Sequence, residues 1–186
     1  MKQRKSAVLF LLLFSLLFSC SLAAADFPRQ ELSVGFIGAF QSGGFANRNR
    51  PGVGMTYRVR LHRLFAAEAG LEYVRRPVGS VGDTRYPDAD DNLFLIPFGP
   101  RLTLTPQEGA WTISLGGGGA YLNHTFGYEN PAIGLVGSSK WGAWAGVGAA
   151  RSLASGRFRL GGNARYYRFG PHLHIITLGP EFSITF

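Results

Sequence analysis

Over most of its length the chain alternates large apolar residues with small or polar ones. In one such segment Leu32, Val34 and Phe36 alternate with Glu31 and Ser33. Successive side chains of a β-strand point to opposite faces, so an alternating segment has one apolar face and one polar face. The pattern predicts eight strands, over residues 31–40, 53–61, 65–73, 93–104, 111–121, 141–149, 157–166 and 176–186.

The connections between these segments alternate in length. Residues 62–64, 106–109 and 152–156 form short connections, whereas 41–51, 75–91 and 123–139 form long ones, and only the short connection 169–171 breaks the trend. Strands joined by short turns pair antiparallel with their neighbours. Pro97 and Pro100 each lack a backbone donor, which predicts a bulge in the fourth strand.

Two architectures produce eight alternating strands, a soluble sandwich or barrel and a membrane-spanning barrel. The strand face opposite the large apolar residues carries mainly Gly, Ala, Ser and Thr with few charges. Such a face suits the narrow interior of an eight-stranded barrel better than a solvated surface. Each segment also has roughly the 9 to 11 residues that a tilted membrane strand requires. We therefore predict an all-β fold, an eight-stranded antiparallel up-and-down transmembrane β-barrel with short periplasmic turns and longer external loops.

Aromatic residues of the apolar parity concentrate near the strand ends, as membrane interfaces favour. Tyr57, in the middle of a strand, is an exception. Between the aromatic ends, residues 111–166 present a smooth Ala and Gly face that could pack against a second copy, although we expect a monomer. The expected girdles are Phe40, Tyr73, Phe94, Tyr121, Trp141 and Tyr166 at the external side, and Phe65, Trp111, Phe158 and Phe186 at the periplasmic side.

The first 25 residues have the features of an export signal. Lys2, Arg4 and Lys5 precede an apolar stretch over 7–18 and a small-residue cleavage site at 23–25. We expect residues 1–25 to be a signal peptide and 26–186 to be the barrel domain. Cys20, the only cysteine, stands in a context that loosely resembles a lipoprotein acylation site, so lipidation stays open. Loss of the signal removes three of the 19 Lys and Arg residues and none of the 11 acids, which lowers the net charge from +8 to +5.

Three stretches together resemble the bacterial outer-membrane β-barrel family of the OmpA and opacity-protein type. They are "SLGGGGAYLN", "GVGAARSLASGRFRLGGNARYY" and the terminal "EFSITF". The resemblance implies a protein of the outer membrane of a Gram-negative-type bacterium, in contact with lipid and lipopolysaccharide. We expect this protein to be non-enzymatic and open to an unknown surface ligand. The resemblance also implies that the outer-membrane assembly machinery reads the last strand through Phe182, Ile184 and Phe186. Its role would be structural in the envelope, or interaction through the external loops.

Charged residues on the inward parity form the second group of candidate functional residues. A charge inside a barrel too narrow for bulk water requires a partner, so a structural network of ion pairs is expected. Arg157 shares this parity, and six Arg against three Glu leave an excess of positive charge that would also fit a narrow anion-preferring channel. The inward position of these charges argues against a nucleic-acid surface. The expected network is Arg58, Arg60, Glu68, Glu72, Arg101, Arg159, Arg165 and Glu181.

An enzyme that modifies lipid A is the other alternative, because some small outer-membrane barrels use a His and a Ser near the outer rim. The candidates His124, His172 and His174 are not followed by a suitably placed serine. The four aspartates of residues 83–91 lack the spacing of a calcium loop, and the "LGGGG" run lacks the lysine and the helix of a phosphate-binding loop. We therefore expect no catalytic, metal or cofactor site and no bound cofactor.

Overall fold

The computed structural model describes residues 30–42, 48–62, 64–81, 84–104, 111–128, 135–153 and 157–186. The proposed signal peptide and Cys20 lie outside these ranges. Among the residues described, there is no helix long and apolar enough to cross a membrane. The strands are β1 (Gln30–Ser42), β2 (Arg48–Arg60), β3 (Phe65–Val81), β4 (Thr84–Thr103), β5 (Trp111–Tyr128), β6 (Leu135–Ser152), β7 (Phe158–Phe169) and β8 (Leu173–Thr185).

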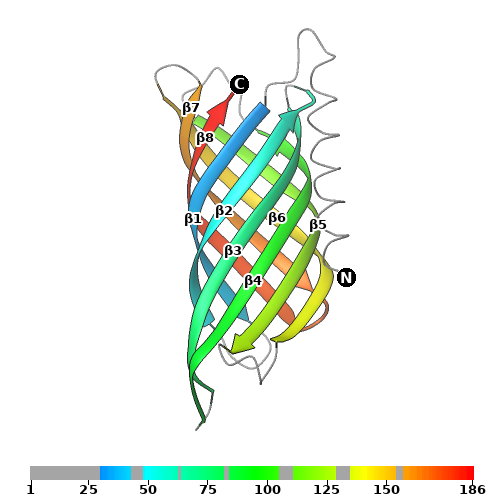
Figure 1. Ribbon diagram of the computed structural model, residues 1–186. Helices are drawn as coiled ribbons and strands as arrows, with labels where there is room; N and C mark the ends of the chain where they lie inside the picture. The colour runs from blue at the N-terminus through cyan, green and yellow to red at the C-terminus, as the bar shows by residue number, and fades with distance from the viewer. Residues whose placement is uncertain are drawn as a thin grey trace.

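The eight strands form one closed antiparallel barrel in sequence order (Figure 1). Each strand pairs with the next along the chain, and β8 closes the sheet against β1 with Leu32 opposite Ile184. At the end of this seam, the backbone N–H groups of Gln30 and Phe186 each donate to the other residue's carbonyl at 3.0 Å. Because this seam is paired, the body of the barrel has no free strand edge, and its paired strands satisfy their backbone groups internally. The predicted fold class is confirmed.

The barrel has two different ends, which we name by their connections. The turn end carries Gln30, Phe186 and the connections 61–64, 104–110 and 153–157. The hairpin end carries the other connections, and there β3 and β4 run on past the body of the barrel (Figure 1). The predicted long loops over 75–91 and 123–139 are therefore wrong in extent, because cross-strand pairing continues to Val81 and Thr84 and to Gly127 and Leu135.

The bulge predicted at the β4 prolines is also wrong. Ala67 pairs with Pro100, and the register with β3 is unchanged at Val74 and Leu93 on the far side of Pro97. A proline removes one donor, and the ladder passes it without an inserted residue. The register shift in this pair of strands lies between Val78 and Ser80, in the hairpin that projects beyond the barrel.

The outward and inward parities follow the predicted alternation. Phe36 is 74% exposed and Trp141 is 70% exposed on the outer surface, whereas Trp144 is 3% exposed inside. Outward aromatic rings meet near the strand ends, with centroids 4.7 Å apart for Tyr73 and Phe94 and 5.0 Å apart for Tyr121 and Trp141. The outer surface is consequently an apolar belt with aromatic edges, which is the surface that a membrane-spanning barrel presents to lipid.

The interior is divided into two parts along the barrel axis. Near the hairpin end it is filled by a hydrophobic cluster, here called the apolar half, and toward the turn end by charged side chains, here called the charged half. The apolar half was not predicted from the sequence. It consists of Ala39, Val74, Leu93, Leu95, Ala120, Leu122, Trp144, Tyr167, Phe169 and Ile175, with Ile37 and Leu173 packed against it.

The glycine run of β5 makes room for one member of this cluster. A Cβ atom added to Gly116 would lie 2.6 Å from the Trp144 ring, closer than any real side-chain contact. The run therefore allows a large aromatic ring to lie inside a narrow barrel. Its position within a strand agrees with the rejection of a phosphate-binding loop.

Candidate functional site: the interior charge network

Glu68 is at the centre of the charged half. Its side chain accepts hydrogen bonds from Arg58 Nε at 2.7 Å, from Arg101 Nη1 at 2.7 Å and from Arg165 Nη2 at 2.9 Å. Arg58 is its register partner on β2, whereas Arg101 comes from β4 and Arg165 reaches it from β7 across the barrel. Glu68 is buried. One carboxylate thus joins four strands through charge-assisted hydrogen bonds, the stronger class of hydrogen bond in proteins.

Arg58 connects this centre to the β1–β8 seam. Its Nη1 donates to Glu31 and, at 3.1 Å, to the Ser33 hydroxyl, and its Nη2 lies 3.2 Å from both carboxylate oxygens of Glu181. Because Arg58 extends across the seam, it meets the carboxylates of both β1 and β8 as well as Glu68.

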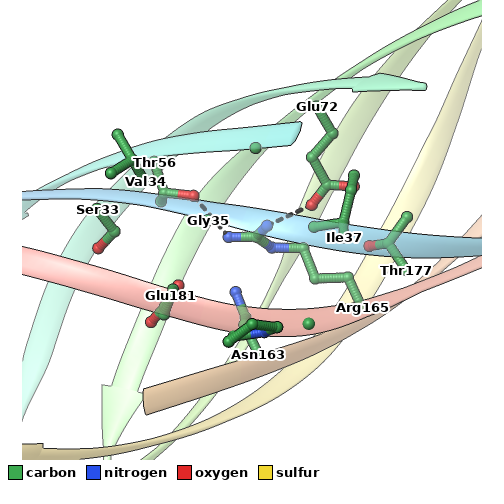
Figure 2. Close-up of a pocket in the computed structure, with 13 residues that line it drawn as sticks. Ser33, Val34, Gly35, Ile37, Thr56, Glu72, Asn163, Arg165, Thr177 and Glu181 are labelled. Carbon is green, nitrogen blue, oxygen red and sulfur yellow. Dashed lines mark hydrogen bonds and ion pairs between the residues drawn. The ribbon is translucent and has the colours of Figure 1, made fainter. Parts of the chain in front are cut away.

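Arg165 forms the boundary with the apolar half. It donates to Glu72 and, at 2.9 Å, to the Thr56 hydroxyl, and Figure 2 shows its guanidinium group between these two residues. The guanidinium also lies 5.6 Å from the centre of the Trp144 ring, within the range of a cation–π contact. Arg165 therefore belongs to the ion-pair network and also packs against the hydrophobic cluster.

Arg159 and Arg101 complete the network at the turn end. Arg159 donates to Glu31 at 2.9 Å and to Thr112. Beyond Glu68, Arg101 donates to Ser114 at 2.9 Å and to Asn163 at 3.3 Å. These hydroxyl and amide partners satisfy donors that the carboxylates do not reach, as burial of a charge requires.

The charges of this network balance. Arg58, Arg101, Arg159 and Arg165 face Glu31, Glu68, Glu72 and Glu181, so the connected set has no formal net charge. The positive excess inside the barrel is smaller than predicted, because Arg157 is exposed at the turn end and Glu31, omitted from the predicted network, accepts from two arginines. An excess remains, since the half-buried Arg60 and the buried Arg50 add positive charge outside this connected set.

Arg60, the remaining predicted member, lies half-buried at the end of β2. It lines a cavity of about 40 Å³ together with Arg58 and Arg159. A second cavity, of about 20 Å³, lies around Glu72 and Arg165 (Figure 2). A single water needs roughly 10–15 Å³ on this measure, so each space has room for only one to a few waters.

The histidines lie away from this network. His174 is on the outer surface, where its Nδ1 is 2.6 Å from the Tyr166 hydroxyl, and His172 is exposed in the β7–β8 turn. His124 pairs in register with Ser138 of β6, a serine that sequence reasoning missed because it follows 14 positions later. The side chains of the aspartates in 83–91 lie outside those described. Among the described residues, no group of three or more His, Cys, Asp or Glu side chains is placed to hold a metal ion.

The residues of the expected assembly signal face outward on the seam strand. Phe182, Ile184 and Phe186 are all exposed, and Phe182 stacks on Phe158 of β7 with ring centroids 5.8 Å apart. They form part of the apolar belt rather than of the interior.

Comparison with known proteins gives structural matches only. No family model and no curated protein matches the chain. The Neisserial surface protein A matches with a TM-score of 0.66 and 12% identity, over 86% of this chain and 100% of that one. The attachment invasion locus protein Ail of Yersinia pestis matches with a TM-score of 0.60 and 15% identity, over 85% of this chain and 98% of Ail. The chain has the fold of the small outer-membrane β-barrels. A further structure of Ail is in complex with the heparin analogue sucrose octasulfate. It matches this chain with a TM-score of 0.63 and 15% identity, over 85% of this chain and 98% of Ail.

Proposed function

We propose that the protein is a non-enzymatic outer-membrane barrel whose role is structural in the envelope, or interaction through the strands that project at the hairpin end. The observation that carries this proposal is the filled interior. The apolar half blocks the barrel near one end, and ion pairs between buried arginines and glutamates occupy the other half. A barrel filled in this way is suited to stability and display rather than transport.

The apolar belt and the predicted signal peptide support placement in the outer membrane. In this orientation the turn end faces the periplasm and the hairpin end faces outward, as short turns and long extensions are arranged in such barrels. Lipid and lipopolysaccharide would contact the belt, and the assembly machinery would engage the outward residues of β8. The proposal includes a surface ligand that binds the projecting hairpins, of unspecified chemical class.

Membrane fractionation is the first test. The protein is expected in the outer-membrane fraction, with heat-modifiable migration on gels and protease resistance of its barrel. Recovery of the chain as a soluble, protease-sensitive domain would contradict the proposal.

Conductance and lipid analysis test the two alternatives. Purified protein in planar bilayers is expected to be silent in all salts, and steady anion-preferring conductance would favour the channel. For the enzyme, mass spectra of lipid A are expected to be the same with the gene present, deleted or carrying Ser138→Ala. A modification that disappears with Ser138→Ala would instead establish Ser138 as part of an active site, with His124 as its register partner.

A further inference from the structure

Three polar side chains lie together on the otherwise apolar outer surface, at the hairpin end of β7 and β8. Tyr166 and Arg168 share the outward parity of β7, and His174 is the register partner of Arg168 on β8. Directly opposed residues of an antiparallel pair have Cβ atoms about 4.5–5.5 Å apart. Arg168 and His174 are therefore immediate neighbours on one patch of surface.

His174 is held in place by Tyr166. The Tyr166 hydroxyl is 2.6 Å from His174 Nδ1, and the two rings stack with centroids 5.8 Å apart and an interplanar angle of 19°. The contact is compatible with either atom as the donor. A phosphate oxygen beside Nε2 selects the state with the ring proton on Nε2, in which the Tyr166 hydroxyl donates to Nδ1.

Arg168, next to His174 on the same patch, is anchored through its Nε atom. Its Nε donates to the carbonyl of Gly170 in the β7–β8 turn at 3.4 Å. The two terminal nitrogens of a guanidinium can bind two oxygens of one phosphate in a planar fork, a geometry that lysine lacks. Beside the Nε2–H of His174, this fork makes a set of donors for a tetrahedral anion.

The surroundings indicate where such an anion would come from. Ile176 is the register partner of Tyr166, and Phe40 is the register partner of Ile176; both are outward and exposed. Trp141, 70% exposed, belongs to the same aromatic edge on β6. The three polar residues thus lie at the border of the apolar belt, at the depth where aromatic girdles mark the headgroup region.

We propose that Tyr166, Arg168 and His174 form a binding site for the phosphate group of an outer-leaflet lipid headgroup, with the acyl chains on the adjacent belt. This inference rests on the proposed placement in the outer membrane. Arg168 and His174 bind the phosphate oxygens, and Tyr166 positions His174. A lipid is favoured over free phosphate because the apolar neighbours add affinity only for a molecule with acyl chains.

The test measures binding of bisphosphorylated lipid A to refolded protein in a neutral maltoside detergent, by native mass spectrometry. The double variant Arg168→Gln/His174→Gln is expected to bind about tenfold or more weakly, since it loses two charge-assisted contacts. Dephosphorylated lipid A is expected to show the same loss with the unaltered protein. Arg151→Gln is the matched control, because Arg151 is an exposed arginine at the turn end, and it is expected to bind as the unaltered protein does.

Three outcomes would overturn the inference. Equal affinity for phosphorylated and dephosphorylated lipid would exclude phosphate recognition. An equal loss in Arg151→Gln would indicate general charge attraction, and displacement of the lipid by millimolar inorganic phosphate would indicate a free-phosphate site.

Tyr166→Phe tests the positioning role, with an intermediate loss of lipid affinity expected when Arg168 and His174 are retained. Fractionation of the unaltered protein tests the outer-membrane placement separately, since binding in detergent does not depend on location.

Discussion

The two halves of the barrel interior are filled by different kinds of interaction. In the charged half each arginine has specific partners at specific atoms, as Arg58 does with Glu31, Glu68 and Glu181. In the apolar half the residues mainly fill volume, and one directional contact is the hydrogen bond that Trp144 Nε1–H donates to the Phe98 carbonyl at 3.0 Å. Apolar packing tolerates exchange between side chains of similar volume, whereas a buried charge that loses its partner is strongly unfavourable. The charged half therefore specifies which strands meet, and the apolar half seals the barrel.

Removal of the central carboxylate is expected to have the largest effect. Glu68→Gln leaves three guanidinium groups short of their shared anion, and loss of one partner from a buried ion pair costs about 3–5 kcal/mol. Urea unfolding of the refolded protein in detergent micelles measures this. Glu181→Gln is the control, because the longer Arg58 contacts of 3.2 Å predict a smaller loss. Equal losses in the two variants would show that Glu68 has no central role.

Truncation in the apolar half comes next. Leu95 is fully buried, and Leu95→Ala is expected to cost about 2–5 kcal/mol through lost contacts and a new cavity. Leu95→Met conserves volume and is expected to cost less than about 1.5 kcal/mol. Both values come from the same unfolding experiment. A larger loss for the Met variant than for the Ala variant would refute the description of this half as simple packing.

A smaller effect is expected where the glycine run meets the apolar half. Gly116→Ala places a methyl group against the Trp144 ring, and overpacking of this kind costs about 1–3 kcal/mol. The emission spectrum of Trp144 should shift as the ring moves, with Trp111 and Trp141 replaced by Phe to remove their signals. Gly54→Ala is a control, because its added Cβ meets ordinary contacts at 3.6 Å.

The outer surface is expected to contribute least to stability in detergent. Phe186→Ala removes an exposed ring, so its unfolding free energy should fall by no more than about 1 kcal/mol. We predict a clear loss of folded protein in the membrane fraction, measured by heat-modifiable migration, because Phe186 belongs to the proposed assembly signal. Phe36→Ala, also exposed but on β1, is expected to assemble normally. An equal defect in both variants would count against a dedicated signal on β8.

Alternation was sufficient to predict the fold and the inward side of each strand. Adjacent strands in a hairpin allowed Arg58 or Arg60 to face Glu68 or Glu72, and the structure pairs Arg58 with Glu68. Contacts across the barrel were not predictable in the same way, because the reach of Arg165 from β7 to Glu68 on β3 depends on barrel curvature and closure. A strand pattern gives the face of a side chain and not its distance across the lumen.

The apolar half was hidden for another reason. Leu93 and Leu95 point inward. Phe94 and Ile96, which alternate with them along the strand, are also apolar but point outward. A segment that is apolar on both faces shows no alternation, so periodicity does not reveal which side is filled. The projecting hairpins were missed because backbone pairing continues beyond the residues in which large and small side chains alternate regularly.

The β1–β8 seam also sets an order of events during folding. The hydroxyls of Ser33 and Ser183 meet at 2.9 Å although 150 positions separate them, and the Arg58–Glu181 contact spans 123 positions. Contacts that close such long loops form late, because the chain entropy they cost must first be offset by local pairing. Until β8 arrives, the buried arginines and glutamates lack part of their partners and two strand edges stay open. A chain that lacks its last strand is therefore expected to be unstable, because the β1 edge and part of the charge network would have no partners.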